Sequence, residues 1–265
     1  MLKEGHQVNI LEVKGLTKTF GGLVANANID MSVEKNSITA VIGPNGAGKT
    51  TFFNMITGVY KPTSGEIVLA GKSIAGFKPH VVARQGISRT FQNIRLFSDI
   101  TVLENVMVGM HNHIRGSLIG TLFQLPKARH EEEEAMKEAY RILEYVGLAD
   151  LLNEAAGNLS YGAQRRLEIA RALATKPSVL LLDEPAAGMN PKETRLLTNL
   201  IQDMCKKYDL TIILIEHDMK LVMEISNHII VLDHGEKIAE GGPEEIRSNP
   251  KVIEAYLGKG AVSLA

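Results

Sequence analysis

The stretch AVIGPNGAGKTTFF, from Ala40 to Phe53, sets three glycines, one lysine and two threonines between apolar residues. It fits the pattern G-x-x-x-x-G-K-[ST], follows an apolar run, and leads into a helical run from Thr50 to Ile56 that Gly58 closes. Glycines allow successive backbone N–H groups to converge, and the start of a helix adds positive potential where they meet. An ordinary glycine-rich turn is the alternative, but Lys49 and Thr50 weigh strongly against it. The stretch therefore predicts a phosphate-binding loop between a strand and a helix.

The side chains of this loop suit a nucleoside triphosphate. Lys49 can reach the β- and γ-phosphates, and the hydroxyl of Thr50 can bind Mg²⁺. Backbone N–H groups along the loop would hold further phosphate oxygens. The residues that we predict to contact the nucleotide here are Gly43, Pro44, Asn45, Gly46, Ala47, Gly48, Lys49, Thr50 and Thr51.

A second motif, VLLLDEP, ends an apolar run in two carboxylates, Asp183 and Glu184. The carboxyl edge of a parallel sheet is where the ligands of α/β proteins bind. Asp183 can therefore hold Mg²⁺, directly or through water, and Glu184 is placed to orient and deprotonate an attacking water. Taken alone, the pair reads equally well as a solvated strand end, but beside a phosphate-binding loop that alternative becomes weak.

Apolar strands that alternate with helical runs predict an α/β fold with a mostly parallel sheet. The runs SVLLLDEP and TIILIEHD are nearly all apolar, as expected for parallel strands that are covered on both faces. A helical run follows Ser160 and stops at Lys176-Pro177. Earlier in the chain, the pattern predicts short strands at residues 9–13, 27–33 and 37–42.

The segment from about Ile94 to Gly157 interrupts this rhythm, with no convincing strand and at least two predicted helices. One helix begins at Thr101, with Glu104 three residues later as a capping box. Another runs from Glu131 to Val146 and ends at Gly147. We interpret the segment as a helical subdomain inserted into the α/β core.

Composition narrows the class of protein. The only cysteine, Cys205, excludes an internal disulfide and a cysteine-based zinc site, and it lies among helix-like residues. A formal net charge of −1 gives no support for general nucleic-acid binding. No apolar run approaches the roughly 20 residues of a membrane span, and the first residues lack the apolar core of a signal peptide. We expect a soluble, intracellular protein that serves a membrane only through a partner.

Upstream of LLLDEP, the run NLSYGAQRRLEIARAL resembles the signature motif of the ATP-binding cassette (ABC) ATPases, and LLLDEP resembles their Walker B motif. The other family motifs follow in order: Gln92 in RTFQN matches the Q-loop glutamine, AAGMN the D-loop, and His217 in LIEHD the switch histidine. Phe20 in LTKTFGG matches the aromatic residue that stacks on adenine. The resemblance covers nearly the whole chain, and its five ordered motifs make it highly specific.

The resemblance implies one P-loop ABC ATPase domain over residues 1–265. Residues 1–93 and 158–265 would form the RecA-like core with an N-terminal antiparallel β subdomain, and residues 94–157 the helical subdomain. ATP and Mg²⁺ are the implied cofactors. The implied catalytic residues are Glu184, His217, Gln92 and Lys49, and the implied metal ligands are Thr50, Gln92 and Asp183.

The family's second anion site is implied at the start of the helix after Ser160. The Ser160 hydroxyl and the N–H groups near Gly162 would cap a γ-phosphate that the other subunit binds, so that two chains sandwich two ATP molecules. Three positions, Tyr161, Ala163 and Asn190, depart from the commonest family pattern, and Asn190 stands where the D-loop usually has an aspartate.

Three of these residues have a plainer interpretation when each is taken alone. A lone histidine at a strand end, such as His217, is usually structural. Phe20 would ordinarily count as core, and the helix after Ser160 as a capped packing helix. Only the complete set of motifs favours the functional interpretation of each over the structural one.

Three further segments, GISRTFQNIRLFSDITVLENVMVG, AAGMNP and IRSNPKVIEAYLG, are similar to the ATP-binding subunit of branched-chain amino-acid importers. The similarity implies a second ATPase subunit (a homodimer or a paralogue), integral membrane permeases and, indirectly, a solute-binding protein. It also implies a place on the cytoplasmic face of a prokaryotic cell membrane. No nucleic-acid partner is expected.

The segment from Phe91 to Val102, with Leu96, Phe97 and Ile100, is the predicted groove for a short permease helix, and internal core is the open alternative. The transported substrate also stays open. ATPases of lipopolysaccharide exporters or of urea and amide importers have closely similar cassettes, and soluble ABC ATPases of iron–sulfur assembly are a rival without any permease.

Overall fold

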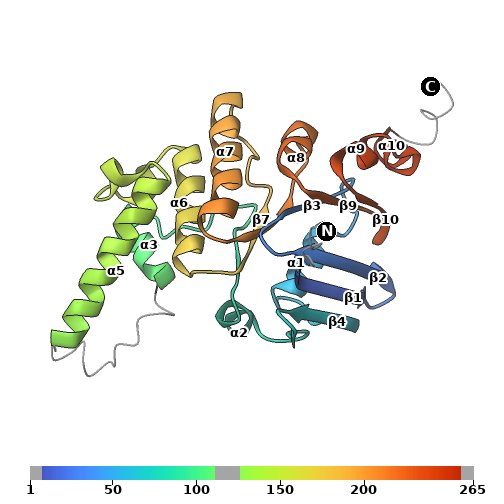
Figure 1. Cartoon of the computed structure of the whole chain (residues 1–265), viewed down its shortest axis with the longest axis horizontal. Coiled ribbons are helices and arrows are strands. Elements are labelled where there is room, and N and C mark those ends of the chain that lie inside the picture. Colours follow the sequence, from blue (N-terminus) through green and yellow to red (C-terminus); the bar gives the residue numbers. More distant parts are fainter. Residues whose placement is uncertain (1–7, 111–125, 258–265) are drawn as a thin grey trace, which may run out of the picture.

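The computed structural model describes residues 8–110 and 126–257, and its first layer is an antiparallel sheet of order β2-β1-β4-β5 (Figure 1). In the second strand, buried Ile29, Met31 and Val33 alternate with exposed Asp30 and Ser32, which gives the sheet one apolar face. The bounds of these strands are β1 (Asn9–Phe20), β2 (Leu23–Glu34), β4 (Ser64–Leu69) and β5 (Lys72–Ser73).

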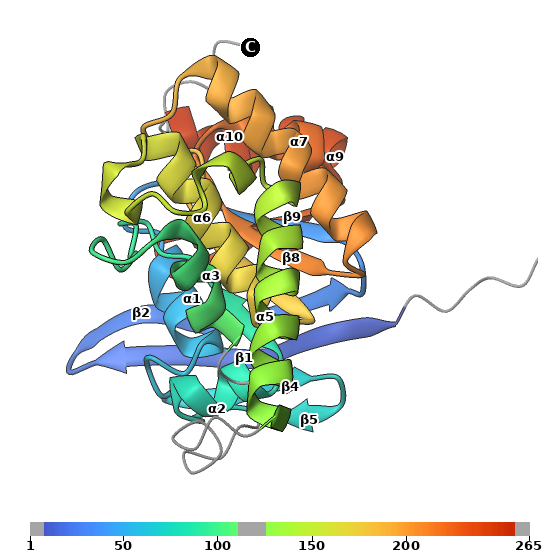
Figure 2. The same cartoon turned by 90° about the vertical axis from the view of Figure 1, so that its left-hand side faces the viewer.

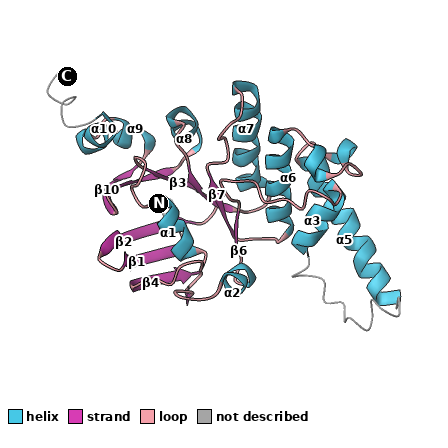
Figure 3. Ribbon diagram, turned by 180° about the vertical axis from the view of Figure 1, so that it is seen from behind, coloured by secondary structure: helices cyan, strands magenta, loops and turns pink. Residues whose placement is uncertain are grey.

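The second sheet has the order β10-β9-β3-β8-β7-β6, and only β10 runs antiparallel to its neighbour (Figure 3). Every residue of β3, β7 and β8 is buried, as expected for strands that are covered on both faces. The predicted α/β fold with a mostly parallel sheet is therefore confirmed. The bounds are β3 (Ile38–Ile42), β6 (Ile87–Arg89), β7 (Val179–Asp183), β8 (Thr211–Ile215), β9 (His228–Asp233) and β10 (Glu236–Gly241).

Helix α1 (Lys49–Ile56) fills the space between the two sheets (Figure 1). Its fully buried Phe52 and Phe53 belong to one apolar cluster with residues of β1, β2 and β4 and with one face of the parallel sheet. The other face of that sheet packs against a second apolar cluster, to which residues of several later helices contribute. These helices are α6 (Tyr161–Ala174), α7 (Pro191–Lys207), α8 (Met219–Ile225) and α9 (Pro243–Arg247), and α10 (Pro250–Leu257) follows them.

Between β6 and β7 the chain leaves the sheet and forms helices α3 (Val102–Met110) and α5 (Pro126–Tyr145), which pack beside α6 (Figure 2). The predicted capping box is present, because the Thr101 hydroxyl accepts from the Glu104 backbone N–H at 3.1 Å and Glu104 Oε2 accepts from the Thr101 N–H at 2.8 Å. Two short 3₁₀ turns, Ala149–Leu151 and Ala156–Asn158, lead on to α6.

Several predicted boundaries are wrong. The strand predicted at 9–13 continues to Phe20, because the positive φ of Gly15 (58°) and a register shift between Val13 and Leu16 reset the alternation of buried residues. The helix predicted from Glu131 already begins at Pro126, and it ends at Tyr145. The pattern also gave no bounds for several elements, namely β4, β5, β6, β9, β10, α7, α8, α9, α10 and the short helix α2 (Pro79–Arg84).

Within the described ranges, none of the helices has the length and apolar character that crossing a membrane requires.

Candidate functional site

The loop after β3 follows a path that only glycine allows at two positions. Gly43 and Gly48 have φ angles of 149° and 97°. A Cβ atom would stand 2.0 Å from the Leu232 carbonyl oxygen at the first position and 2.6 Å from the Ala25 carbonyl oxygen at the second. The loop therefore packs directly against backbone on both sides, which fixes the path of its N–H groups.

The side chain of Lys49 lies folded back over this loop. Its Nζ donates to the carbonyl oxygens of Gly43 (2.7 Å) and Pro44 (2.9 Å), and the residue is only 6% exposed. Burial lowers the pKa of the Lys49 ammonium, while the carboxylates of Glu184 and Asp183 oppose that shift. No side chain caps the start of α1, so the N–H groups of its first turn are available to a ligand.

Strand β7 carries the two predicted carboxylates to the same edge, where each has a different environment. Asp183 is 3% exposed and pairs with the Arg89 guanidinium, with Nη2 and Oδ2 2.5 Å apart. Arg89 Nη1 also donates to the Asn54 side chain at 2.6 Å. Asp183 is thus paired with a buried cation, Arg89, that sequence reasoning missed. The available signal was that Arg89 lies three residues before Gln92, and therefore near the same edge of the sheet.

Glu184 contacts two of the three other predicted catalytic side chains. Its Oε2 accepts from Gln92 Nε2 at 2.9 Å, and its Oε1 lies 3.0 Å from His217 Nε2. The residue has a positive φ of 48°, which is uncommon for a residue with a side chain and directs the chain sharply away from the strand. Three residues from three separate loops, Gln92, Glu184 and His217, therefore meet at one point.

A buried carboxylate, Glu216, ties together the loops that carry Glu184 and His217. Its Oε1 accepts from the Ala186 N–H at 2.8 Å, and its Oε2 accepts from the His217 N–H at 3.0 Å. Burial raises the pKa of the Glu216 carboxyl, and its backbone N–H donors oppose that shift. Sequence reasoning missed this residue; the signal was a carboxylate directly after an otherwise apolar strand.

A cleft of about 530 Å³ unites most of the predicted site. Its size suits a nucleotide-sized ligand. The predicted residues that line it are Asn45, Gly46, Ala47, Gly48, Lys49, Thr50, Thr51, Gln92, Glu184 and His217. The lining residues that sequence reasoning missed are Leu23, Val24, Ala25, His234 and Gly235, from the start of β2 and the turn after β9.

The predicted metal ligands offer a hydroxyl, a side-chain amide and a carboxylate, from Thr50, Gln92 and Asp183. Mg²⁺ prefers such oxygen donors, usually through one or two carboxylates together with substrate phosphates and water. Thr50 and Gln92 line the cleft, whereas Asp183 lies buried at its edge with Arg89. The donor chemistry of this chain therefore fits magnesium beside a phosphate.

Phe20 lies at the end of β1 and is not among the residues that line the cleft. Its ring meets the Tyr60 ring edge-on, with centroids 5.3 Å apart, and Lys18 Nζ is 4.8 Å from the Phe20 centroid. The residue is 42% exposed, so it is not the core residue of the plainer interpretation.

Ser160 and Gly162 are not among the lining residues of the cleft either. Ser160 is the exposed N-cap of α6, and its side chain makes no capping hydrogen bond. Gly162 is buried against α7, where an added Cβ would stand 2.7 Å from Glu193 Oε1. A second helix N-terminus is therefore open on the surface of the described chain.

Asn190, which departs from the commonest family pattern, has a clear structural role. Its side chain accepts from the backbone N–H groups of Lys192 and Glu193, each at 3.0 Å. The Glu193 carboxylate in turn accepts from the Asn190 N–H at 3.1 Å. Asn190 thus completes a capping box at the start of α7.

Comparisons with known proteins agree with these motifs. The family model described as "ABC transporter" matches residues 26–187, and the one described as "Branched-chain amino acid ATP-binding cassette transporter" matches residues 236–262. The high-affinity branched-chain amino acid transport ATP-binding protein BraF of Pseudomonas aeruginosa is 52% identical, over 94% of this chain and 98% of that protein.

Solved structures are similar over the same length. An ATP-binding cassette of an ABC transporter in its ADP conformation is 36% identical with a TM-score of 0.83, covering 95% of this chain and 100% of that one. A dimeric ATP-binding cassette in a post-hydrolysis state, bound to ADP and phosphate, is 26% identical with a TM-score of 0.74, covering 88% of this chain and 98% of that one.

Proposed function

The chain belongs to the ABC transporter family of ATP-binding proteins, and from that premise we propose that it is the ATP-hydrolysing subunit of a branched-chain amino-acid importer. One observation carries the enzymatic part: Gln92, Glu184 and His217 meet beside the phosphate-binding loop that lines the same cleft. The match at residues 236–262 and the name of BraF support the amino-acid substrate over the lipopolysaccharide, urea or iron–sulfur alternatives.

The triphosphate of ATP would lie along residues 43–51, against the first turn of α1. Lys49 would exchange its contacts with the Gly43 and Pro44 carbonyls for contacts with phosphate oxygens. Thr50, Gln92 and Asp183 would hold Mg²⁺, which when bound neutralises charge on the phosphates. Phe20 would approach the adenine from the end of β1, where its exposed ring is free of the core.

Glu184 would act on the attacking water. Its carboxylate already has two partners of suitable chemistry, since Gln92 donates to one oxygen and His217 lies beside the other. In the reacting complex, Glu184 would orient the water and accept its proton, while His217 would donate a hydrogen bond to the γ-phosphate. Glu216 would keep both loops at their present separation through its backbone contacts.

The second anion site supports a dimer. Ser160 and the N–H groups near Gly162 would cover a γ-phosphate held by another copy, or by a paralogue, because neither residue reaches the cleft of its own chain. ATP would thus join two subunits, and its hydrolysis would release them.

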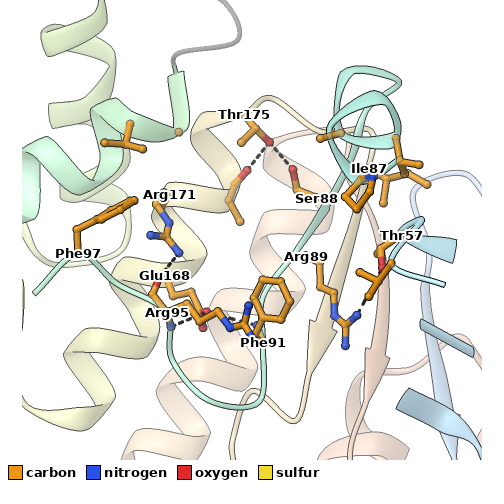
Figure 4. A pocket seen from close by; sticks show the side chains of 17 residues that line it. Thr57, Ile87, Ser88, Arg89, Phe91, Arg95, Phe97, Glu168, Arg171 and Thr175 are labelled. Atoms are coloured by element: carbon orange, nitrogen blue, oxygen red, sulfur yellow. Dashed lines mark hydrogen bonds between the residues drawn. The ribbon is translucent and has the colours of Figure 1, made fainter. Parts of the chain in front are cut away.

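The permease would dock in an apolar groove of about 500 Å³ between α2, the Q-loop segment (residues 91–95), α3 and α6 (Figure 4). Of the predicted segment, Phe91, Arg95 and Phe97 line this groove, whereas Leu96 packs against the core. Exposed Val108 (45%) on α3 adds a further apolar surface. We place the docked assembly, with its solute-binding protein on the far side, at the cytoplasmic face of a prokaryotic membrane.

Substitution of Glu184 tests the enzymatic part. A general base contributes roughly 10²- to 10⁴-fold, so Glu184→Gln should lower ATP turnover about 1,000-fold while ATP binding and ATP-dependent dimerisation persist. Turnover is measured by phosphate release and the dimer by analytical ultracentrifugation. Glu144→Gln, an exposed carboxylate on α5, is the control. Undiminished turnover in Glu184→Gln contradicts the proposed role.

Affinity isolation from membranes tests the transport part. A multispanning permease should be recovered with the native chain, and Val108→Asp should reduce its recovery at least about fivefold because a charge would enter the apolar groove. Leu196→Asp is the matched control, since Leu196 is similarly exposed (55%) but lies on α7 outside the groove. Equal losses in both variants, or no permease with the native chain, contradict the proposal.

A further inference from the structure

Two oppositely charged side chains, Arg165 and Glu168, are buried one turn apart in the middle of α6. Arg165 Nη1 and Glu168 Oε2 lie 2.7 Å apart, and the side chains are 0% and 2% exposed. Arg165 is the largest fully buried side chain in the part of the chain that the structure describes. Burying two charges is costly unless hydrogen bonds satisfy their remaining groups. The contacts of this pair are therefore informative.

Those contacts go to the backbone of the Q-loop segment, residues 91–95. Arg165 donates to the carbonyl oxygens of Phe91 (2.6 Å) and Gln92 (2.8 Å). Glu168 Oε1 accepts from the N–H groups of Phe91 and Arg95, each at 3.3 Å. The pair, which we call the Arg165–Glu168 brace, thus binds both backbone carbonyl oxygens and backbone N–H groups of the segment.

A third side chain of α6 extends the same connection. Arg171, on the next turn after Glu168, donates to the Arg95 carbonyl oxygen. Figure 4 shows Glu168, Arg171, Arg95 and Phe91 gathered along one wall of the apolar groove. The segment is consequently fastened to α6 along its length.

The two ends of this connection lie at different parts of the proposed site. At one end, Gln92 donates to Glu184 inside the cleft. At the other end, Ser160 begins α6 on the open surface, five residues before Arg165. A rigid link between the Q-loop segment and α6 therefore joins the nucleotide of this chain to the surface that would meet the nucleotide of the next.

From these contacts we infer that the Arg165–Glu168 brace is a positioning device that makes the Q-loop segment and the N-terminus of α6 move as one unit. The inference rests on the proposed ATP-driven dimer. Nucleotide bound beside Gln92 sets the orientation in which Ser160 is presented to the partner. A permease segment seated in the groove, against Phe91 and Arg95, acts on the same unit.

The test separates dimerisation from nucleotide binding, in a Glu184→Gln parent that retains ATP. The double variant Arg165→Met/Glu168→Leu replaces both charges by apolar side chains of similar volume, an exchange that folds commonly tolerate. It should bind ATP as a single subunit within twofold of the parent, but dimerise about tenfold more weakly, within the usual range of coupling between sites. Fluorescent-ATP titration and analytical ultracentrifugation measure the two constants.

Arg166→Met provides the matched control, because Arg166 is the next residue of α6 and donates to the carbonyl oxygens of Val146 and Gly147, not to the Q-loop segment. Both constants should stay within twofold of the parent. The conservative variant Arg165→Lys keeps the charge but cannot donate to two carbonyls as a planar guanidinium does. It should weaken dimerisation about threefold, and it replaces the double variant if that one does not fold.

The possible results distinguish a failure of this inference from a failure of the proposed function. Unchanged dimerisation in the double variant, or in Arg165→Lys where that replaces it, overturns the inference. An equal loss of ATP affinity and dimerisation also overturns it, because general damage to the fold would then be the cause. A Glu184→Gln parent that binds no ATP or forms no dimer overturns the proposed function instead, together with what rests on it.

Discussion

The N-termini of α1 and α6 are built alike and end in different surroundings. Both helices begin without a side-chain cap hydrogen bond, so that both present unpaired N–H groups. At α1, Lys49, the start of β2 and the Glu184 cluster enclose that end within a cleft. At α6, Ser160 and the 44%-exposed Tyr161 lie on the surface.

The contrast between the two helix ends shows which anion site a single chain can complete by itself. An anion site with dipole, cation and enclosing walls can bind phosphate alone, whereas a helix N-terminus without a cation or walls binds it weakly. The α1 site has the helix dipole, a cation and enclosing walls, all from residues 23–235 of one chain. The α6 site has only the helix dipole. We therefore expect changes at α1 to affect ATP binding directly, and changes at α6 to act only when two chains meet.

The largest effect expected from the comparison concerns Lys49. Lys49→Ala removes the only lysine or arginine among the residues that line the cleft in the described chain, and it should weaken ATP binding by about 100-fold, or roughly 3 kcal/mol. Titration of single subunits with a fluorescent ATP analogue measures it. Lys220→Ala, which removes a cation from the start of α8 outside the cleft, is the control. An unchanged affinity would remove the distinction between the two helix ends.

A smaller but more selective effect is expected at the open end. Asp is as good an N-cap as Ser, so Ser160→Asp should leave α6 folded while placing a negative charge where the partner's phosphate would lie. ATP turnover should fall about 30-fold, with the affinity of a single subunit for ATP kept within twofold. Ser160→Asn is the uncharged control, and it should keep turnover within about threefold. If Ser160→Asp weakens ATP binding by the single chain, the two ends are not separate sites.

The sequence predicted best those parts of the site that follow a fixed local pattern. The phosphate-binding loop and Glu184 were predicted from a few neighbouring residues, whereas Gln92 and His217 were predicted from their place in the ordered motifs of the family; the structure brings all of them to one cleft. Arg89 was missed because its importance depends on a contact with Asp183, 94 residues away in the sequence. Glu216 was missed for the same reason, since its partner Ala186 lies 30 residues away.

The fold shows the same division. Short apolar runs predicted the strands β3, β7 and β8, and every residue of these strands is buried. It missed β10 because that strand lies at the sheet edge with mostly polar, partly exposed residues, and its pairing with β9 comes from tertiary contact. Local sequence patterns do not determine which distant strand pairs with an edge strand.

The smallest expected effect tests whether the start of α7, which packs against α6, can be destabilised without an effect at the α1 site. Asn190 caps α7, and the Glu193 carboxylate that completes this box lies against Gly162 of α6. Loss of an N-cap costs about 1 kcal/mol, so Asn190→Ala should lower the free energy of unfolding by about that amount, while Asn190→Asp should change it by less than about 0.5 kcal/mol. Chemical denaturation followed by circular dichroism measures both. ATP affinity of the single chain should stay within twofold, because the cap has no contact with the cleft. A loss of ATP affinity in Asn190→Ala would mean that the two helix ends are coupled already within one chain, and the contrast between a complete and an incomplete site would then have to be abandoned.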